Sequence, residues 1–343
     1  RPRMRSAVAL LLLAAAASSA SAERTLSLVR FEDEEGLVRR GAYIGDNRAR
    51  LLDESDGFDP ARPFEAPLTN DVREIRTLLS PIDQPNEIYA IGLNYWGHIN
   101  ATNMTAPLTP SLFFKNRHAY NHPFASVVIP PLSSQPDYEG ELGIVLSGCK
   151  DVSVDAAVED CVAGYTVCHD VSARCYQIEQ DDDSIGCPGN GDQFSFSKSF
   201  DTHAPIGPTL VSPELLGDAS GLNLTTTVNG ELRQDVSTSD LIFGVREIVS
   251  FLSTGTTLDA GSVICTGTPD GVGMTLDPPT YLQDGDVVEI TISDIGTLSN
   301  PIERGPAGAD GAVKIPAASV SGPFYIGLDG SLDGHLPRAV LAA

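Results

Sequence analysis

The chain has 343 residues, and its 46 acidic side chains against 22 Lys and Arg give a formal charge of −24 and a pI near 4.4. Such an excess of acid disfavours a nucleic-acid-binding protein, which needs a basic face, and it disfavours adhesion to an anionic membrane. Hydrophobic residues make up 41% and charged residues 20% of the chain, which excludes a disordered protein or a coiled coil. The length predicts two domains, or one large domain with an appendage.

The first 22 residues predict a secretory signal peptide. Three arginines precede an apolar run at 7–17, and the segment ends in the small residues Ala20, Ser21 and Ala22. The apolar run is too short to span a bilayer, which takes about 20 residues. We therefore expect cleavage after Ala22 and a soluble, secreted product, with an uncleaved anchor or a disordered tail as the alternative. Three N-x-[ST] sequons agree with secretion, at Asn100, Asn103 and Asn223.

Residues 23–85 predict a small N-terminal β domain and a linker. Apolar and polar residues alternate over 26–31, as in a half-buried strand, and 41–45 is a second candidate strand. Residues 72–79 predict a weak helix. At the other end of the chain, the Gly-, Pro- and Ala-rich tail at 305–343 is expected to be irregular.

Residues 86–304 predict the main domain, in which strands outnumber helices. Asn229 and Gly230 predict a two-residue hairpin turn because both tolerate positive φ, and 240–252 predicts a helix with Asp240 as N-cap. The elements do not alternate as in a doubly wound sheet, so we expect an α+β, β-rich fold, a mixed β-roll or barrel with covering helices. Short apolar runs predict strands at 88–93, 126–129, 138–146, 164–168, 222–228, 262–265 and 286–292.

The stretch D-Y-E-G-E-L at 137–142 carries the strongest chemical signal. Glu139 and Glu141 are two residues apart on a predicted strand, so both carboxylates leave the same face. Apolar residues follow them, which predicts a core strand where two like charges repel and a hard divalent cation would neutralise both. The alternative is that the pair lies at the solvated end of an exposed strand. Asp170 ends the next apolar strand and is a natural third ligand.

A Gly-rich loop at 266–273 follows another predicted strand. Its backbone N–H groups could hold a carboxylate. A phosphate cradle is the alternative, but the loop lacks the Gly-Lys-Ser/Thr ending of a P-loop.

These residues belong to a set of motifs that resembles the fumarylacetoacetate hydrolase family over about residues 26–300. The motifs are A-I-G-L-N-Y-x-x-H at 90–98, F-F-K at 113–115, D-Y-E-G-E-L at 137–142, G-Y-T-V-x-x-D-V-S-A-R at 164–174, S-K-S-F-D-T at 197–202 and T-G-T-P-x-G-V-G at 266–273, with Gln177 and Gln234 beside them. The resemblance implies a β-roll around a divalent-metal site, a small-molecule keto or 1,3-diketo acid as substrate, and a homodimer. It also implies roles for single residues, with Mg²⁺ (or Mn²⁺ or Ca²⁺) as cofactor. The implied metal ligands are Glu139, Glu141 and Asp170, the catalytic residues His98, Lys198 and Gln177, and the substrate-binding residues Tyr95, Arg174 and Thr268.

One position departs from the family pattern. Hydrolytic members pair the histidine with a glutamate three residues later, and this chain has Ala101 there. Our first prediction is a metal-dependent hydrolase that cleaves a C–C bond in a keto or 1,3-diketo acid. An oxaloacetate-type decarboxylase, an enol–keto isomerase and a secreted metal-binding pseudoenzyme are the alternatives.

The cysteine count is even, which predicts disulfides in an oxidising compartment, and no Cys/His cluster predicts zinc. Given the implied fold, Cys149 and Cys161 are close enough to bridge. Cys168 and Cys265 lie in core strands and are expected to be buried free thiols. A bridge between Cys175 and Cys187 would pin the loop over the metal site.

Overall fold

The structure is a computed structural model, and the residues it describes are 24–97, 99, 105–178 and 191–305. Several predictions made above lie outside these described residues. They concern the signal peptide at 1–22, His98, the sequons at Asn100 and Asn103, Ala101, Cys187 and the tail from 306 onward.

The N-terminal strands form an antiparallel group in which β1 pairs with β2 and β5, and β3 pairs with β2 and β4. Both predicted strands are confirmed, but the predicted helix at 72–79 is wrong. Its backbone groups pair with strands β3 and β1 instead, which a short exposed helix could not match. The strands are β1 Ser27–Glu32, β2 Val38–Gly45, β3 Arg48–Leu52, β4 Leu68–Glu74 and β5 Thr77–Leu79.

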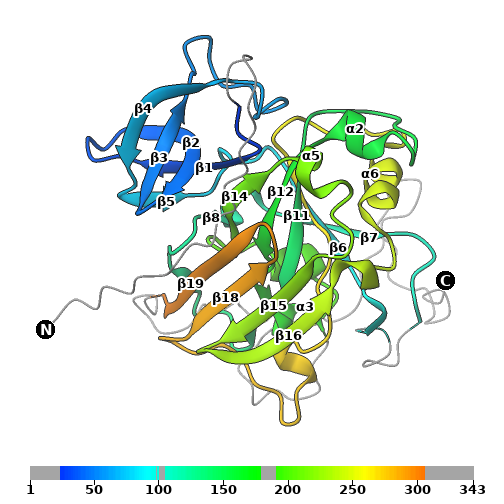
Figure 1. The fold of residues 1–343 in the computed structure, drawn as a ribbon. Coiled ribbons are helices and arrows are strands. Elements are labelled where there is room, and N and C mark those ends of the chain that lie inside the picture. The colour runs from blue at the N-terminus through cyan, green and yellow to red at the C-terminus, as the bar shows by residue number, and fades with distance from the viewer. Residues whose placement is uncertain (1–23, 98, 100–104, 179–190, 306–343) are drawn as a thin grey trace, which may run out of the picture. The chain divides into compact units, whose positions relative to one another are not determined.

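A large sheet continues from β1, which also pairs with β14, so the N-terminal strands belong to the same compact unit (Figure 1). Its order runs β4-β3-β2-β1-β14-β12-β11-β17-β6-β7, with β5 and β8 off this path. The predicted domain boundary at residue 85 stays a prediction. The remaining strands of this sheet are β6 Ile88–Gly92, β7 Ser111–Lys115, β8 Tyr120–Asn121, β11 Gly140–Leu146, β12 Val162–His169, β14 Ala204–Val211 and β17 Val263–Cys265.

A second sheet has the order β16-β15-β18-β19-β9, and Figure 1 shows β15, β16, β18 and β19 side by side. The predicted hairpin is confirmed, because Val228 pairs with Glu231 and the two turn residues, Asn229 and Gly230, have φ of 52° and 79°. The short strands β10 and β13 pair with each other. The bounds are β9 Val127–Ile129, β10 Pro136–Asp137, β13 Ser172–Ala173, β15 Asn223–Val228, β16 Glu231–Ser237, β18 Val287–Ile292 and β19 Gly296–Arg304.

Helices are short and few in the described ranges, and none of those described is long and apolar enough to cross a membrane. The predicted helix at 240–252 begins later than expected. Leu241 bridges to Tyr95 and the Ile242 N–H bonds the Asn94 carbonyl, so these residues pair with the chain after β6. The helices are α2 Ala157–Cys161, α3 Arg174–Gln177, α4 Phe194–Ser197, α5 Pro213–Leu216 and α6 Val245–Ser253, with 3-10 turns η1 Arg117–Ala119, η3 Thr238–Asp240 and η4 Gly273–Thr275.

Strand β11 is buried on both faces because a separate apolar core covers each. Leu142 and Ile144 face the core that lies between β11, β12 and the second sheet. Val145 faces the other core, which includes Ile88 of β6 and Phe113 of β7. The β-rich mixed fold is therefore confirmed, and the described sheets form a roll that does not close into a barrel.

The cysteines are only partly as expected. The predicted Cys149–Cys161 bridge is confirmed. The prediction of free thiols at Cys168 and Cys265 is wrong, because β12 and β17 approach each other across β11 and bring the two Cα atoms to 6.0 Å. Cys175 is disulfide-bonded as well, while its predicted partner, Cys187, lies outside the described residues.

Gly140 stands between the two glutamates and turns its Cα toward β15, where an added Cβ would collide with the Thr226 hydroxyl. We predict that Gly140→Ala pushes β11 away from β15 and costs about 1–3 kcal/mol of stability, as overpacking does. Urea unfolding would measure this cost. Shortening Thr226 to glycine in the same chain should restore part of the loss. Equal stability of Gly140→Ala and wild type would contradict the close packing.

Candidate metal centre

Three carboxylates meet where β11 begins and β12 ends. Glu139 directly precedes β11, Glu141 is its second residue, and Asp170 directly follows β12. The antiparallel register pairs Gly140 with His169, and the Asp170 N–H donates to the Glu139 carbonyl at 2.9 Å. One oxygen from each carboxylate lies within 4.8 Å of the others, and all three side chains are buried. The fold thus brings together the three predicted ligands.

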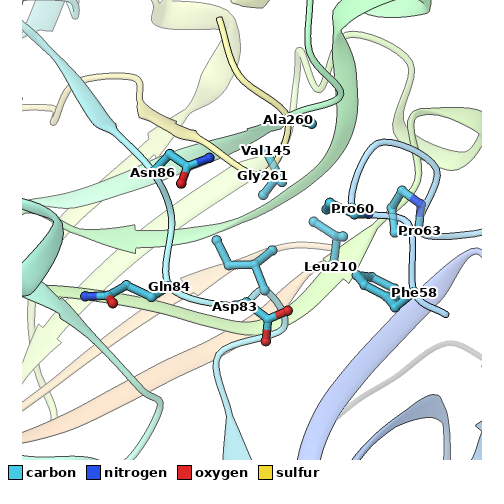
Figure 2. A pocket seen from close by; sticks show the side chains of 11 residues that line it. Phe58, Pro60, Pro63, Asp83, Gln84, Asn86, Val145, Leu210, Ala260 and Gly261 are labelled. Atoms are coloured by element: carbon cyan, nitrogen blue, oxygen red, sulfur yellow. The ribbon is translucent and has the colours of Figure 1, made fainter.

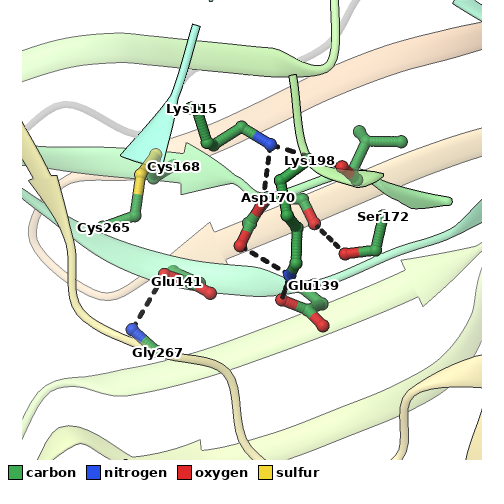
Figure 3. The surroundings of a disulfide bond; sticks show 10 residues. Lys115, Glu139, Glu141, Cys168, Asp170, Ser172, Lys198, Cys265 and Gly267 are labelled. Carbon is green, nitrogen blue, oxygen red and sulfur yellow. Dashed lines mark hydrogen bonds and ion pairs between the residues drawn. A yellow bond between two sulfur atoms is a disulfide. The ribbon is translucent and has the colours of Figure 1, made fainter. Parts of the chain in front are cut away.

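Two lysines lie against these carboxylates (Figure 3), and an arginine also reaches one of them. The Lys198 ammonium, at the end of α4, donates to Glu139 at 2.6 Å and to Asp170 at 2.7 Å. Lys115, the last residue of β7, donates to the other oxygen of Asp170 at 2.5 Å. Arg174 reaches Glu139 at 2.7 Å. Both lysines are 1% exposed, so these ion pairs are shielded from water.

Glu141 forms no ion pair within the part of the chain that the structure describes, but the Gly267 backbone N–H donates to it at 2.8 Å. The predicted Gly-rich loop therefore holds a carboxylate, and that carboxylate belongs to the protein. Gly267 has φ of +102°, and a Cβ there would come within 2.8 Å of the Asn94 Cβ, so the loop requires glycine at this point.

The environment separates the pKa values of these acids. Burial, together with the charges of Asp170 and Glu139, raises the pKa of Glu141 well above its usual value. Burial also acts to raise the pKa of Asp170, but Lys115 and Lys198 outweigh it and hold that pKa below its usual value. Burial lowers the pKa of Lys115. The charges of Asp170 and Glu139 overcome burial at Lys198 and raise its pKa.

The remaining predicted residues surround this cluster. Arg174 binds Asp137 at 2.8 Å as well as Glu139, and donates to the Gln177 side chain at 2.7 Å, so its guanidinium orients Glu139. Thr268 donates to the Gly140 carbonyl at 3.1 Å, between the two glutamates.

The Tyr95 ring is fully buried, and its hydroxyl has no hydrogen-bond partner within the described part of the chain. Burial, and then the charge of Glu141, raises its pKa. Its contact with substrate stays a prediction.

Sequence reasoning assigned no role to three residues that hold the site together. Lys115 binds Asp170, and Asp137 accepts from Arg174 and from the Gly273 and Met274 N–H groups. The Gln234 amide accepts from the Gly140 N–H and donates to Thr268. Lys115 and Asp137 stand in the motifs quoted above and Gln234 was given beside them, so the family resemblance was the sequence signal that could have identified these residues. Their partners are distant in sequence.

Figure 2 shows a separate cavity of about 170 Å³ near the N-terminal strands. Phe58, Val145 and Leu210 supply apolar walls, and Asp83 supplies a charge. None of the predicted site residues lines it, so it takes no part in the chemistry proposed below.

The donor set of the cluster fits a hard divalent cation. Four buried carboxylates, including Asp137, face three cationic side chains, and the uncompensated charge falls on Glu141. Carboxylate oxygens are the ligands that Mg²⁺, Mn²⁺ and Ca²⁺ prefer. Glu139, Glu141 and Asp170 would hold the ion.

We predict that Glu141→Gln stabilises the metal-free protein by about 1–3 kcal/mol at pH 8, because burial and the charges of Asp170 and Glu139 disfavour an ionised carboxylate here more than Lys198 and the Gly267 N–H favour it. Folded Glu141 keeps its proton above the ordinary pKa of 4.5. The stability that this proton contributes is therefore complete below pH 4.5 and is lost as the pH rises through the raised pKa. The difference in free energy of unfolding between the variant and the wild type should therefore increase with pH. Urea unfolding in the presence of EDTA would measure it.

Added Mg²⁺ should make the wild type more stable than Glu141→Gln, because only the wild type would gain stability from binding the ion. Substituting the exposed Glu231 by glutamine is the matched control and should change neither result. A variant less stable than wild type in EDTA at pH 8 would argue against an uncompensated charge at this position.

Among curated proteins, the chain is 36% identical over 227 residues to the rat (Rattus norvegicus) mitochondrial oxaloacetate tautomerase Fahd2a, covering 66% of this chain and 69% of that protein. Related mitochondrial tautomerases from cattle and humans match to the same extent. These relatives contradict the predicted secretion and leave the signal peptide and the glycosylated sequons without support, because they are named as mitochondrial proteins.

Among solved structures, a 2-hydroxyhepta-2,4-diene-1,7-dioate isomerase from Mycobacterium marinum matches with a TM-score of 0.65 and 33% identity, covering 82% of this chain and 99% of that one. A fumarylacetoacetate hydrolase from Exiguobacterium antarcticum matches with a TM-score of 0.66 and 32% identity, covering 82% and 100%. Residues 87–303 match the family described as "Fumarylacetoacetate (FAA) hydrolase C-terminal". With its fold, its three carboxylates and these relatives in agreement, the chain belongs to the fumarylacetoacetate hydrolase family.

Proposed function

We propose that the protein is a divalent-metal-dependent enol–keto isomerase of small 2-oxo acids, with Mg²⁺ as the first choice of ion and Mn²⁺ or Ca²⁺ as alternatives. The observation that carries this proposal is the buried Lys198 ammonium, which bonds both Glu139 and Asp170. Conversion between keto and enol forms develops negative charge on the carbonyl oxygen, and fixed positive groups in a dry site stabilise that charge.

A bound divalent cation would supply Lewis-acid polarisation of the substrate carbonyl. Lys198 keeps its proton at neutral pH because its pKa is raised, so it can stabilise the enolate oxygen and return a proton to it. Lys115 and Arg174 hold Asp170 and Glu139 in place. Tyr95, Arg174 and Thr268 remain the predicted substrate-binding residues. Gln177 remains a predicted catalytic residue, and His98 remains the predicted base.

Two of the similar proteins reported above favour isomerisation, whereas the one from Exiguobacterium antarcticum is named as a hydrolase. Similar proteins are named as an oxaloacetate tautomerase and as a dienedioate isomerase. Neither enol–keto exchange nor decarboxylation needs an attacking water, so Ala101 in place of the glutamate is no obstacle to either. C–C hydrolysis, our first prediction, needs an activated water and stays a prediction. Decarboxylation of a 2-oxo diacid would use the same enolate and is the second candidate.

A pseudoenzyme is disfavoured because Lys198, Gln177 and all three carboxylates are retained. The predicted homodimer also stays a prediction, and light scattering of the purified protein would test it.

We predict that the wild type with Mg²⁺ accelerates ketonisation of enol-oxaloacetate, followed by the loss of enol absorbance, and that EDTA abolishes the effect. Lys198→Met should lower the rate about 10²–10³-fold, as removal of one oxyanion donor does, and Lys198→Arg should retain part of the activity. Lys150, which is exposed, provides the matched control as Lys150→Met. A wild-type rate equal to the uncatalysed rate in Mg²⁺ and Mn²⁺ would refute the proposal.

We predict that Ala101→Glu raises the hydrolysis of acylpyruvates by at least about tenfold, a threshold set below the usual contribution of about 10²–10⁴-fold from acid–base catalysis, and leaves ketonisation within about threefold. Chromatography of the cleavage products would measure hydrolysis. A wild type that already hydrolyses acylpyruvates faster than it ketonises oxaloacetate would instead support the C–C hydrolase.

A further inference from the structure

The Cys168–Cys265 disulfide joins two strands that are not neighbours in the sheet. β11 lies between β12, which carries Cys168, and β17, which carries Cys265. In the antiparallel registers, Cys168 lies opposite Glu141 and Cys265 lies opposite Gly143. Residues directly opposite project from the same face, so the bridge crosses β11 on the face that carries Glu141. Figure 3 shows the bridge beside Glu141, Lys115 and Asp170.

Gly143 leaves room for this crossing. It shares a face with Glu141, and a Cβ at this position would lie 3.6 Å from the Cys168 Cβ and 2.9 Å from a methyl group of Thr166. Any larger side chain would occupy the space beside the bridge. Both cysteines are fully buried and belong to the apolar core that includes Val145 and Phe113.

Each bridged cysteine is two residues from a group that shapes the metal centre. Asp170 follows Cys168, and its N–H is tied to the Glu139 carbonyl. Gly267 follows Cys265 and holds the Glu141 carboxylate through its N–H. The end of β12 therefore carries one predicted ligand, Asp170, and the end of β17 leads to a hydrogen-bond donor to another, Glu141. A change in their separation would change the distance between Asp170 and Glu141.

Electrostatic repulsion favours a larger separation of these two strand ends when no cation is bound. Glu141 and Asp170 are buried, and one carboxylate oxygen of each lies within 4.8 Å of the other, so the two side chains repel each other when both are ionised. Hydrogen bonds alone would let the strand ends separate to relieve this repulsion. A covalent link two residues away resists the separation.

We infer that the Cys168–Cys265 disulfide is a positioning element of the metal centre, and that its formation raises the affinity of the site for a divalent cation. This inference rests on the metal centre of the proposed function but not on the reaction catalysed there. Metal affinity therefore depends on the thiol–disulfide state of a bridge that never touches the ion.

The redox step is a thiol–disulfide exchange. A dithiol reductant attacks one sulfur, the S–S bond breaks, and the second thiol of the reductant releases the protein as two cysteine thiols. Two electrons and two protons pass to the protein, and the reductant becomes a disulfide. Because both sulfurs are buried, the exchange requires local opening of β12 or β17.

The first experiment counts thiols in the purified protein by alkylation under denaturing, non-reducing conditions and peptide mapping. The inference expects Cys168 and Cys265 to be unlabelled without reductant and labelled after dithiothreitol. Complete labelling of both in freshly purified, never-reduced protein would overturn it.

The second experiment measures Mn²⁺ affinity by titration calorimetry without substrate, in the wild type and in the double variant Cys168→Ala, Cys265→Ala. We expect about 10–100-fold weaker binding, the range seen when groups that orient metal ligands are lost. The matched control is Cys149→Ala, Cys161→Ala, which removes the bridge beyond the far end of β11 and should change affinity by less than about threefold. Equal affinity of the first variant and wild type, or an equal loss in both variants, would refute the inference.

If the double variant does not fold, the Mn²⁺ affinity of wild type treated with dithiothreitol provides the same test. Its affinity should fall to the level of the variant and recover after air oxidation, with the thermal unfolding temperature of the metal-free protein as the readout of general stability. Equal Mn²⁺ affinity of the oxidised and the reduced wild type would refute the inference even if ketonisation were confirmed. Redox-dependent affinity in a protein that fails to ketonise oxaloacetate would refute the reaction and leave the positioning role intact.

Discussion

The removal of four carboxylates from water is the constraint on which the rest of this structure depends. A buried carboxylate is tolerated only when it is paired, hydrogen-bonded or protonated. Asp170 has two lysines, Glu139 has a lysine and an arginine, and Asp137 has an arginine and three backbone N–H groups. Glu141 has no such ion pair among the described residues, and burial together with the neighbouring acids raises its pKa. The three cationic side chains therefore pair with the other three carboxylates and leave the excess negative charge at Glu141. A divalent ion would be most strongly attracted to this position.

Strand β11 brings the buried glutamates into the core, and its two faces pack against different parts of the protein. On one face, Gly140 allows β15 to approach, and Gln234 from β16 ties the strand to the Gly-rich loop. On the other face, Gly143 leaves space beside the disulfide. Gly140 lies between the two glutamates and Gly143 lies two residues after Glu141, so the close packing of β11 occurs at the same residues as the metal centre.

Sequence patterns predicted those parts of the molecule that depend on local order. The core strands, the Asn229-Gly230 turn and the grouping of Glu139, Glu141 and Asp170 follow from apolar runs and from spacing along strands. Strand β14 was missed because two prolines interrupt its pattern, although all eight of its residues are buried. Lys115 and the Cys168–Cys265 bridge were missed for a different reason. Their partners lie 55 and 97 residues away, and only the sheet order brings them together.

The same balance of charge bears on the substrate. A divalent ion would change the residual charge of the cluster from about −1 to +1, within a chain whose formal charge is −24. The field of the whole protein repels an anionic acid at long range, but salt screens this repulsion beyond about 8 Å. Attraction therefore begins only near the site, where the low dielectric strengthens it. Under the proposed function, a compact dianion such as a 2-oxo diacid would gain more from this short-range attraction than a monoanion would, so we propose diacids rather than simple keto acids as the preferred substrates.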